Sequence, residues 1–117
     1  MMIDDDDINN EVNSLLIHNF DPNIEIVKYL TVDDGLNYLR NNPDKLPELI
    51  FCDINLPHKN GWDFLQEFKT LQLDIDVYML TSSLDILDRN IEEQHPDVSG
   101  FIEKPLYDYK IKDIFNK

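Results

Sequence analysis

The sequence alternates between short apolar runs and segments whose apolar residues recur at helical spacing, and this alternation constrains the fold more than any other feature. Strands joined by helices pair in parallel through crossover connections, and central runs that are apolar nearly throughout need cover on both faces. The sequence therefore predicts an α/β fold with a doubly wound, five-stranded parallel sheet and helices on both faces. The expected strands are Met1–Ile3, Ile24–Val27, Leu49–Cys52, Ile75–Leu80 and Gly100–Ile102.

The segments between these runs have the apolar spacing of amphipathic helices. The spaced residues are Ile8, Val12, Leu15 and Leu16, then Leu36 and Leu39, then Leu65, Phe68 and Leu71, then Leu84, Leu87 and Ile91, and finally Tyr107, Ile111, Ile114 and Phe115. Short polar residues near the expected helix starts can cap free backbone N–H groups. They are Asp7, Asp33, Asn60 and Asp85.

Length and charge restrict the classes of function. A chain of 117 residues suits one domain, so residues 1–117 are expected to form a single domain with no attached effector. A formal net charge of −14 argues against binding nucleic acid, which requires a basic surface. Cys52 is the only cysteine, and no apolar stretch or basic leader indicates a membrane span or secretion. We expect a cytoplasmic protein that binds neither nucleic acid nor membrane.

Polar residues follow the expected strands at their carboxyl ends, where doubly wound sheets place their binding sites. Asp4 and Asp5 follow the first strand, Asp53 the third, Thr81 the fourth and Lys104 the fifth. Three neighbouring carboxylates repel one another unless a cation is bound or one of them is protonated. Mg²⁺ is the expected cation, because it prefers oxygen ligands and retains water that a phosphate can replace.

A metal at this edge would make Asp53 a nucleophile towards phosphorus, since carboxylates form acyl phosphates and most of the catalysis is positioning and charge neutralisation. Lys104 would pair with one phosphoryl oxygen, and the Thr81 hydroxyl would donate to another. Taken singly, each residue has an ordinary structural explanation: a tag or acidic terminus for Asp4–Asp7, a turn for Asp53, a helix cap for Thr81, and a solubilising role for Lys104.

Several short motifs together resemble the receiver domains of two-component response regulators, of which the chemotaxis regulators are examples. Each motif alone is weakly specific, but their order and spacing cover essentially the whole chain. They are Ile3–Asp6, Phe51–Pro57 followed by Gly61, Leu80–Ser83, and Glu103–Pro105. The resemblance implies the flavodoxin-like strand order 2-1-3-4-5. It also implies a cis peptide bond before Pro105.

The resemblance assigns roles position by position. It implies that Asp53 accepts the phosphoryl group, and that Asp5, Asp53 and the backbone carbonyl of Asn55 bind Mg²⁺, with Asp4 acting through water. Thr81 and Lys104 match the phosphate-sensing residues. Phe101 matches the aromatic switch position, and since it lacks the hydroxyl of tyrosine, its switching would rest on packing alone.

The expected activity is signalling rather than catalysis on a separate substrate. A histidine kinase or histidine phosphotransfer protein would supply the phosphoryl group, and an unknown downstream protein would recognise the modified state. A phosphorelay intermediate is the alternative within the same class. The segment Gln94–Val98 departs from the short Gly-Ala connection of many relatives on the face used for output, so the partner cannot be copied from a relative.

Two other classes share parts of this pattern. A haloacid-dehalogenase-like phosphatase also uses Asp, Thr, Lys and Mg²⁺, but it needs a second acid two residues after the nucleophile, where this chain has Asn55. A flavodoxin-type flavin site needs a phosphate loop rich in Ser, Thr and Gly after the first strand, where this chain has aspartates. Among the remaining residues, His18, His58 and His95 are expected at the surface, and Trp62, Phe64 and Phe68 in or beside the core.

Overall fold

Five parallel strands form the sheet in the computed structural model, which describes residues 1–115. The strand order is β2-β1-β3-β4-β5. This confirms the predicted doubly wound α/β class and the order 2-1-3-4-5. The strands are β1 (Met2–Ile3), β2 (Lys28–Tyr29), β3 (Leu49–Asp53), β4 (Asp76–Thr81) and β5 (Gly100–Glu103).

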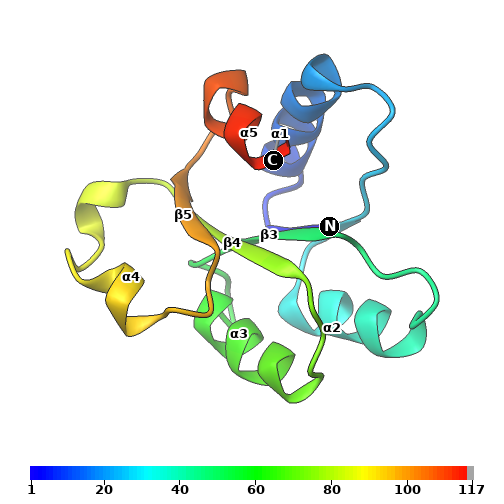
Figure 1. Cartoon of the computed structure of the whole chain (residues 1–117), viewed down its shortest axis with the longest axis vertical. Coiled ribbons are helices and arrows are strands. Elements are labelled where there is room, and N and C mark those ends of the chain that lie inside the picture. Colours follow the sequence, from blue (N-terminus) through cyan, green and yellow to red (C-terminus); the bar gives the residue numbers. More distant parts are fainter. Residues whose placement is uncertain (116–117) are drawn as a thin grey trace.

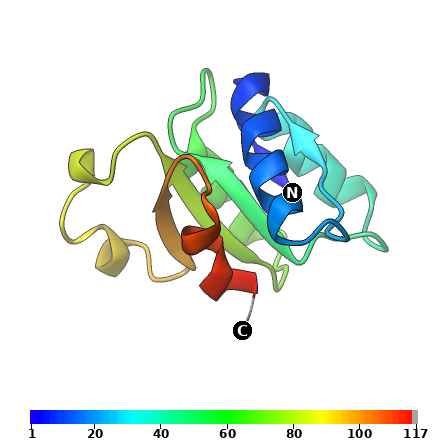
Figure 2. The same ribbon diagram turned by 90° about the horizontal axis from the view of Figure 1, so that it is seen from above.

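Helices cover both faces of the sheet. Figure 1 shows α1 and α5 on one face and α2, α3 and α4 on the other, and Figure 2 shows α1 and α5 again side by side from above. The helices are α1 (Asp7–Phe20), α2 (Val32–Asn41), α3 (Gly61–Thr70), α4 (Ile91–Gln94) and α5 (Asp108–Phe115), and a single 3₁₀ turn, η1, spans Leu84–Ile86. Within the described part of the chain, no helix has the length and apolar character needed to cross a membrane.

Two apolar clusters, one on each side of the sheet, form the core. Successive strand residues point to opposite faces, so β3 contributes to both. Ile50 and Cys52 pack into the cluster beside α2 and α3, and Phe51 packs into the cluster beside α1 and α5. Phe64 and Phe68 are buried as predicted, and Trp62 packs partly buried against the same cluster.

The position of β2 corrects one prediction. The apolar run Ile24–Val27 was expected to form the second strand, but the paired residues are Lys28 and Tyr29. Met2 and Ile3 of β1 pair with them, and the Met2 N–H also donates to the Val27 carbonyl. Residues 24–26 precede the start of β1 in register, so they have no strand to pair with. Ile24 and Ile26 instead pack against the apolar cluster beside α1 and α5.

The segment between β4 and β5 corrects a second prediction. The spacing of Leu84, Leu87 and Ile91 predicts one helix, but the chain forms the η1 turn and, after a break, the four-residue α4. Leu84 and Ile86 are exposed, and Asn90, which precedes α4, makes no side-chain cap hydrogen bond. A continuous helix here would therefore gain few apolar contacts, and short helices need such contacts for stability.

The orientation of α1 corrects a third expectation. The helix forms, but Ile8 and Leu15, whose spacing predicts it, are 69% and 61% exposed. Its buried residues are Asn10, Asn13, Ser14 and Ile17. Apolar spacing therefore located the helix correctly and indicated the wrong inner face.

Helix capping follows the predicted chemistry at somewhat different residues. Asn60 caps α3 as expected, in a reciprocal capping box with Asp63. Asp6 rather than Asp7 caps α1, Thr31 rather than Asp33 caps α2, and Ser83 rather than Asp85 caps η1. Asp7, Asp33 and Asp85 lie inside the first turn instead, where the helix dipole favours a negative charge.

Candidate functional site

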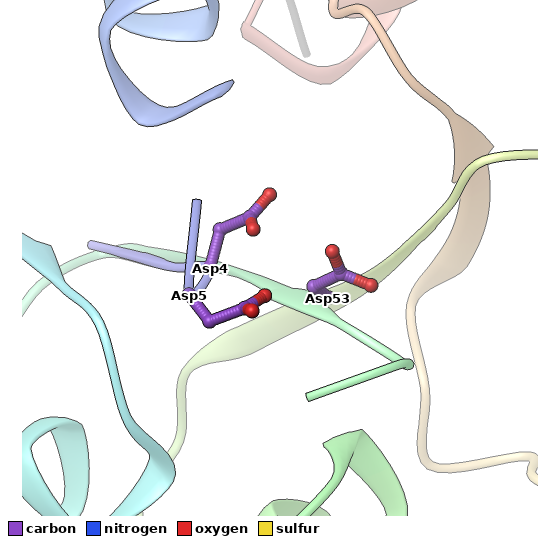
Figure 3. A group of neighbouring side chains, drawn as sticks. All are labelled: Asp4, Asp5 and Asp53. Atoms are coloured by element: carbon purple, nitrogen blue, oxygen red, sulfur yellow. The ribbon is translucent and has the colours of Figure 1, made fainter. Parts of the chain in front are cut away.

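Three carboxylates meet at the carboxyl ends of β1 and β3. The two strands are neighbours with Ile3 opposite Cys52, so Asp4 and Asp53 leave the sheet side by side. Carboxylate oxygens of Asp4, Asp5 and Asp53 all lie within 4.8 Å of one another, and Figure 3 shows them facing a common space. Asp4 and Asp53 are buried and Asp5 is exposed, so the cluster is open to solvent on one side.

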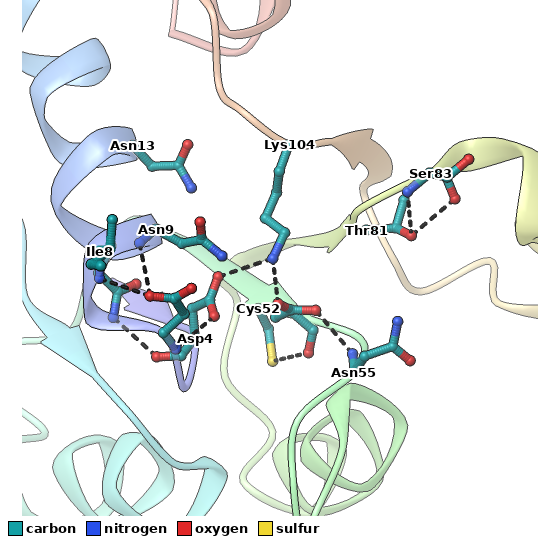
Figure 4. A network of polar contacts seen from close by, with 12 residues as sticks. Asp4, Ile8, Asn9, Asn13, Cys52, Asn55, Thr81, Ser83 and Lys104 are labelled. Carbon is teal, nitrogen blue, oxygen red and sulfur yellow. Dashed lines mark hydrogen bonds and ion pairs between the residues drawn. The ribbon is translucent and has the colours of Figure 1, made fainter.

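Lys104 brings a positive charge to this cluster from the end of β5. Its ammonium Nζ lies 2.6 Å from Asp53 Oδ2 and 3.2 Å from Asp4 Oδ2 (Figure 4). The Lys104 backbone N–H donates to the Thr81 carbonyl on β4, which fixes the start of the side chain. The peptide bond between Lys104 and Pro105 is cis, as predicted.

The charges in this pocket do not balance, because one ammonium faces three carboxylates. Burial raises the pKa of Asp4 above its ordinary value and the charge of Asp53 adds to this, although the Asp6 N–H and Lys104 oppose it. Burial lowers the pKa of Lys104, but the hydrogen bond and charge of Asp53, together with the charge of Asp4, outweigh it and raise that pKa. The pocket therefore favours protons and cations.

The backbone around Asp53 is fixed by contacts with the start of α3. The Asn55 N–H donates to Asp53 Oδ1 at 2.9 Å, and the Gly61 N–H donates to the Ile54 carbonyl. A Cβ at Gly61 would lie 2.8 Å from both the Asp53 carbonyl oxygen and the Ile54 Cα. Only glycine therefore allows α3 to approach Asp53 this closely.

Thr81 ends β4 fully buried, but its hydroxyl is bonded away from Asp53. It donates to the Ser83 carbonyl at 3.0 Å and accepts from the Ser83 N–H at 3.2 Å (Figure 4). Phe101, on the neighbouring β5, is half-buried with its ring 6.0 Å from that of Trp62. The structure thus gathers Asp4, Asp5, Asp53 and Lys104 in one pocket and places Thr81 and Phe101 beside it.

Sequence reasoning missed two buried residues next to this pocket, Asn10 and Asn13 of α1. The Asn10 amide donates to the Asp4 carbonyl, and the Asn13 side-chain oxygen accepts from the Leu106 N–H. A signal was present, because Asn10, Asn13 and Ile17 share one helix stripe at spacings of three and four residues. The exposed apolar residues of α1 concealed it.

The histidines lie away from the pocket. His18 and His58 are exposed as predicted, whereas His95 is half-buried and stacks on Trp62 with ring centroids 4.2 Å apart. Cys52 is buried beside Asp53, and burial together with the charges of Asp53 and Asp4 raises the pKa of its thiol. This thiol is therefore protonated at neutral pH and a poor nucleophile.

The family of the chain follows from comparison with known proteins. The family model for the response regulator receiver domain matches residues 1–116. The chain belongs to this family, as its sequence motifs indicated. No curated protein sequence matches the chain.

Solved structures agree with this family and with the fold. A two-component response regulator from Cytophaga hutchinsonii is 30% identical, with a TM-score of 0.87 over 98% of this chain and 91% of that one. A two-component response regulator from Legionella pneumophila is 24% identical, with a TM-score of 0.82 over 97% and 92%. A response regulator from Thermotoga maritima, solved in complex with Mg²⁺ and beryllium fluoride, is 16% identical, with a TM-score of 0.74 over 98% and 93%.

Proposed function

We propose that the chain accepts a phosphoryl group on Asp53 and signals through proteins that recognise the phosphorylated state. The observation that carries this proposal is the contact of 2.6 Å between Lys104 Nζ and the Asp53 carboxylate, beside the carboxylates of Asp4 and Asp5. Membership of the receiver family supports the same assignment. The domain would carry out only its own phosphorylation and dephosphorylation, rather than act as an enzyme on other substrates.

The acidic cluster has the chemistry of a magnesium site. Its oxygen atoms are hard ligands, their charge exceeds that of Lys104, and Asp5 is open to solvent. Asp5, Asp53 and the Asn55 backbone carbonyl would hold the ion, with Asp4 acting through water. Bound Mg²⁺ would supply neutralisation of the phosphoryl charge. The complex of the Thermotoga maritima protein with Mg²⁺ and beryllium fluoride supports this cofactor for the fold.

The side chains of the pocket have distinct parts in the reaction. An Asp53 carboxylate oxygen forms a bond to phosphorus as the bond from phosphorus to the histidine nitrogen of the donor breaks, and that nitrogen keeps the bonding electrons. Lys104 exchanges its contact with the Asp53 carboxylate for one with a phosphoryl oxygen. Its backbone anchor on Thr81 keeps the ammonium within reach of both partners.

Thr81 and Phe101 would convert the modification into a change of surface. The Thr81 hydroxyl leaves Ser83 to donate to a phosphoryl oxygen, which moves the loop that follows β4. Phe101 then packs into the space that opens, shifting an equilibrium between two existing conformations. The domain would therefore act as a phosphorylation-driven binding module in the cytoplasm. Its phosphodonor would be a histidine kinase or phosphotransfer protein.

Mass spectrometry tests the proposal directly. Incubation with Mg²⁺ and a small phosphodonor such as an acyl phosphate should add one phosphoryl group, and removal of Mg²⁺ by a chelator should prevent the addition. Asp53→Asn should abolish the modification, whereas Asp85→Asn, at an exposed acid outside the pocket, should not change it. An unmodified mass for the folded wild-type chain under these conditions would refute the proposal.

A further inference from the structure

The inner face of α1 is polar where a core-facing helix is ordinarily apolar. Asn10 and Asn13 are each 2% exposed, and Ser14 is 5% exposed. Burial of amide groups carries a desolvation cost, which hydrogen bonds only partly offset. Apolar residues of similar size would pack the same space more favourably, so packing alone does not account for this face.

Asn13 is bonded to the segment that carries Lys104. Its Oδ1 accepts from the Leu106 N–H at 2.9 Å, in a buried contact that joins residues 93 positions apart. Leu106 follows Lys104 by two residues, and the backbone N–H of Lys104 itself donates to the Thr81 carbonyl. The backbone of this segment is therefore held at two points, Lys104 by Thr81 and Leu106 by Asn13. Figure 4 shows the Asn13 side chain extending from α1 towards the strand end that bears Lys104.

Asn10 is bonded to the segment that carries Asp4. Its Nδ2 donates to the Asp4 carbonyl at 3.0 Å, in a fully buried contact. Its Oδ1 is buried and, within residues 1–115, has no hydrogen-bond partner. An unpaired buried acceptor destabilises a fold, so the single hydrogen bond of Asn10 does not offset the desolvation free energy of its amide.

We propose that Asn10 and Asn13 are positioning residues for the phosphorylation pocket: Asn13 holds the Lys104 segment and Asn10 holds the Asp4 segment at the distances that the pocket requires. This inference rests on the proposed function and adds two residues to it. Neither amide contacts the phosphoryl group or the metal; both act through the backbone of a neighbouring segment. The helix thereby sets the spacing between the ammonium from β5 and the carboxylate from β1.

Three variants separate positioning from structural support at Asn13. Asn13→Leu removes the acceptor at similar volume, and Asn13→Asp keeps an oxygen that can accept from Leu106. Ser14→Ala is the matched control, because the Ser14 hydroxyl is buried on the same face but contacts the Met2 sulfur instead of a pocket segment. The rate of phosphorylation is measured against phosphodonor concentration at saturating Mg²⁺, and stability by urea unfolding.

Asn13→Leu should lower the phosphorylation rate by about tenfold to a hundredfold, because small displacements of positioning groups have effects of this size. Asn13→Asp should recover a large part of the rate, and Ser14→Ala should change stability alone. Wild-type rates in folded Asn13→Leu, or equal losses in the Leu and Asp variants, would overturn the role of Asn13. If Asn13→Leu does not fold, Asn13→Ala removes the same acceptor and replaces it in each comparison.

Asn10 is tested by magnesium binding, which does not depend on phosphorylation. Asn10→Leu should weaken Mg²⁺ affinity about tenfold or more, as does loss of other groups that orient metal ligands. Its resistance to urea should be equal to or above that of the wild type. Unchanged Mg²⁺ affinity would overturn the role of Asn10. A wild-type chain that is not phosphorylated would instead overturn the proposed function, so the two failures are distinguishable.

Discussion

At the scale of single residues, Asp4 lowers the stability of the fold while it supplies a negative charge to the cluster that can bind a cation. It is buried beside Asp53, and its pKa is raised, so the ionised form is less favourable in the folded chain than in the unfolded one. For an acid whose pKa is raised on folding, the stabilisation is complete below the unfolded pKa and is lost as the pH rises through the folded value. At neutral pH without Mg²⁺, Asp4 therefore destabilises the fold.

Asp4→Asn should accordingly raise the free energy of unfolding by about 1 kcal/mol in the presence of a chelator, because it removes one of the crowded charges. Mg²⁺ at about a hundredfold excess over its Kd should stabilise the wild type by about 2.7 kcal/mol, and the variant by less. Urea unfolding with and without Mg²⁺ measures both effects. Asp85→Asn, at an exposed acid, serves as the control. A variant less stable than wild type in chelator would contradict this account.

Gly61 is a second residue whose environment leads to a prediction. An added Cβ would meet backbone atoms of Asp53 and Ile54, which cannot move without displacing the phosphorylation site. Gly61→Ala should therefore destabilise the chain by about 1–3 kcal/mol and slow phosphorylation.

Gly35→Ala provides the matched control for this substitution. Its Cβ would meet the flexible end of the Ile3 side chain, and alanine is the better helix former inside α2. Its net cost should be smaller, and phosphorylation should remain at the wild-type rate. Equal effects of the two alanines in urea unfolding and in the phosphorylation assay would show that the backbone contact of Gly61 has no special role.

At the scale of whole elements, α1 has an outer face that contributes little to stability. Leu15 is 61% exposed, whereas Ile17 is buried against the cluster beside α5. Leu15→Ala should change the free energy of unfolding by no more than about 0.5 kcal/mol, and Ile17→Ala should lower it by about 2–5 kcal/mol. Urea denaturation of both variants checks this, and a larger loss at residue 15 would mean that the helix is rotated from its position here.

The same helix shows where prediction from the sequence succeeded and where it failed. Ile8, Val12 and Leu15 located α1, but Asn10 and Asn13 are bonded to residues 6 and 93 positions away, so their helical spacing could not show what they contact. The start of β1 at Met2 determined which residues of β2 pair, and composition could not predict that register. Exposure of Leu84 and Ile86 likewise depends on what packs nearby, and not on their spacing.

The pocket was more predictable than these elements. Asp4, Asp5, Asp53 and Lys104 each lie beside or at the end of a strand, and parallel strands bring their carboxyl ends to one edge of the sheet whatever their precise limits. The turn of the Thr81 hydroxyl towards Ser83 was not predicted, because it depends on one local rotamer. Topology therefore fixes which residues meet, and side-chain contacts fix how they are oriented.

At the scale of the whole molecule, acidic charge should oppose folding. The chain has 24 acidic and 10 basic residues, and self-repulsion in such a chain favours expanded states. Raising NaCl from about 10 to about 150 mM shortens the screening length from about 30 to about 8 Å. The midpoint of urea unfolding should therefore rise with NaCl.

Mg²⁺ should stabilise the wild type more than NaCl at the same ionic strength, and Asp53→Asn should lose most of that difference. An equal response to both salts would argue against a specific ion site.

The brevity of β2 has a consequence for how this protein behaves in a crowded solution. With only Lys28 and Tyr29 paired, the sheet offers a foreign chain almost no length of free backbone to bind along this border, and one of the two residues is charged. Short, charged edges of this kind discourage the pairing of strands between molecules. A sheet that ends in so short a strand should therefore have little tendency to pair with another copy at this border.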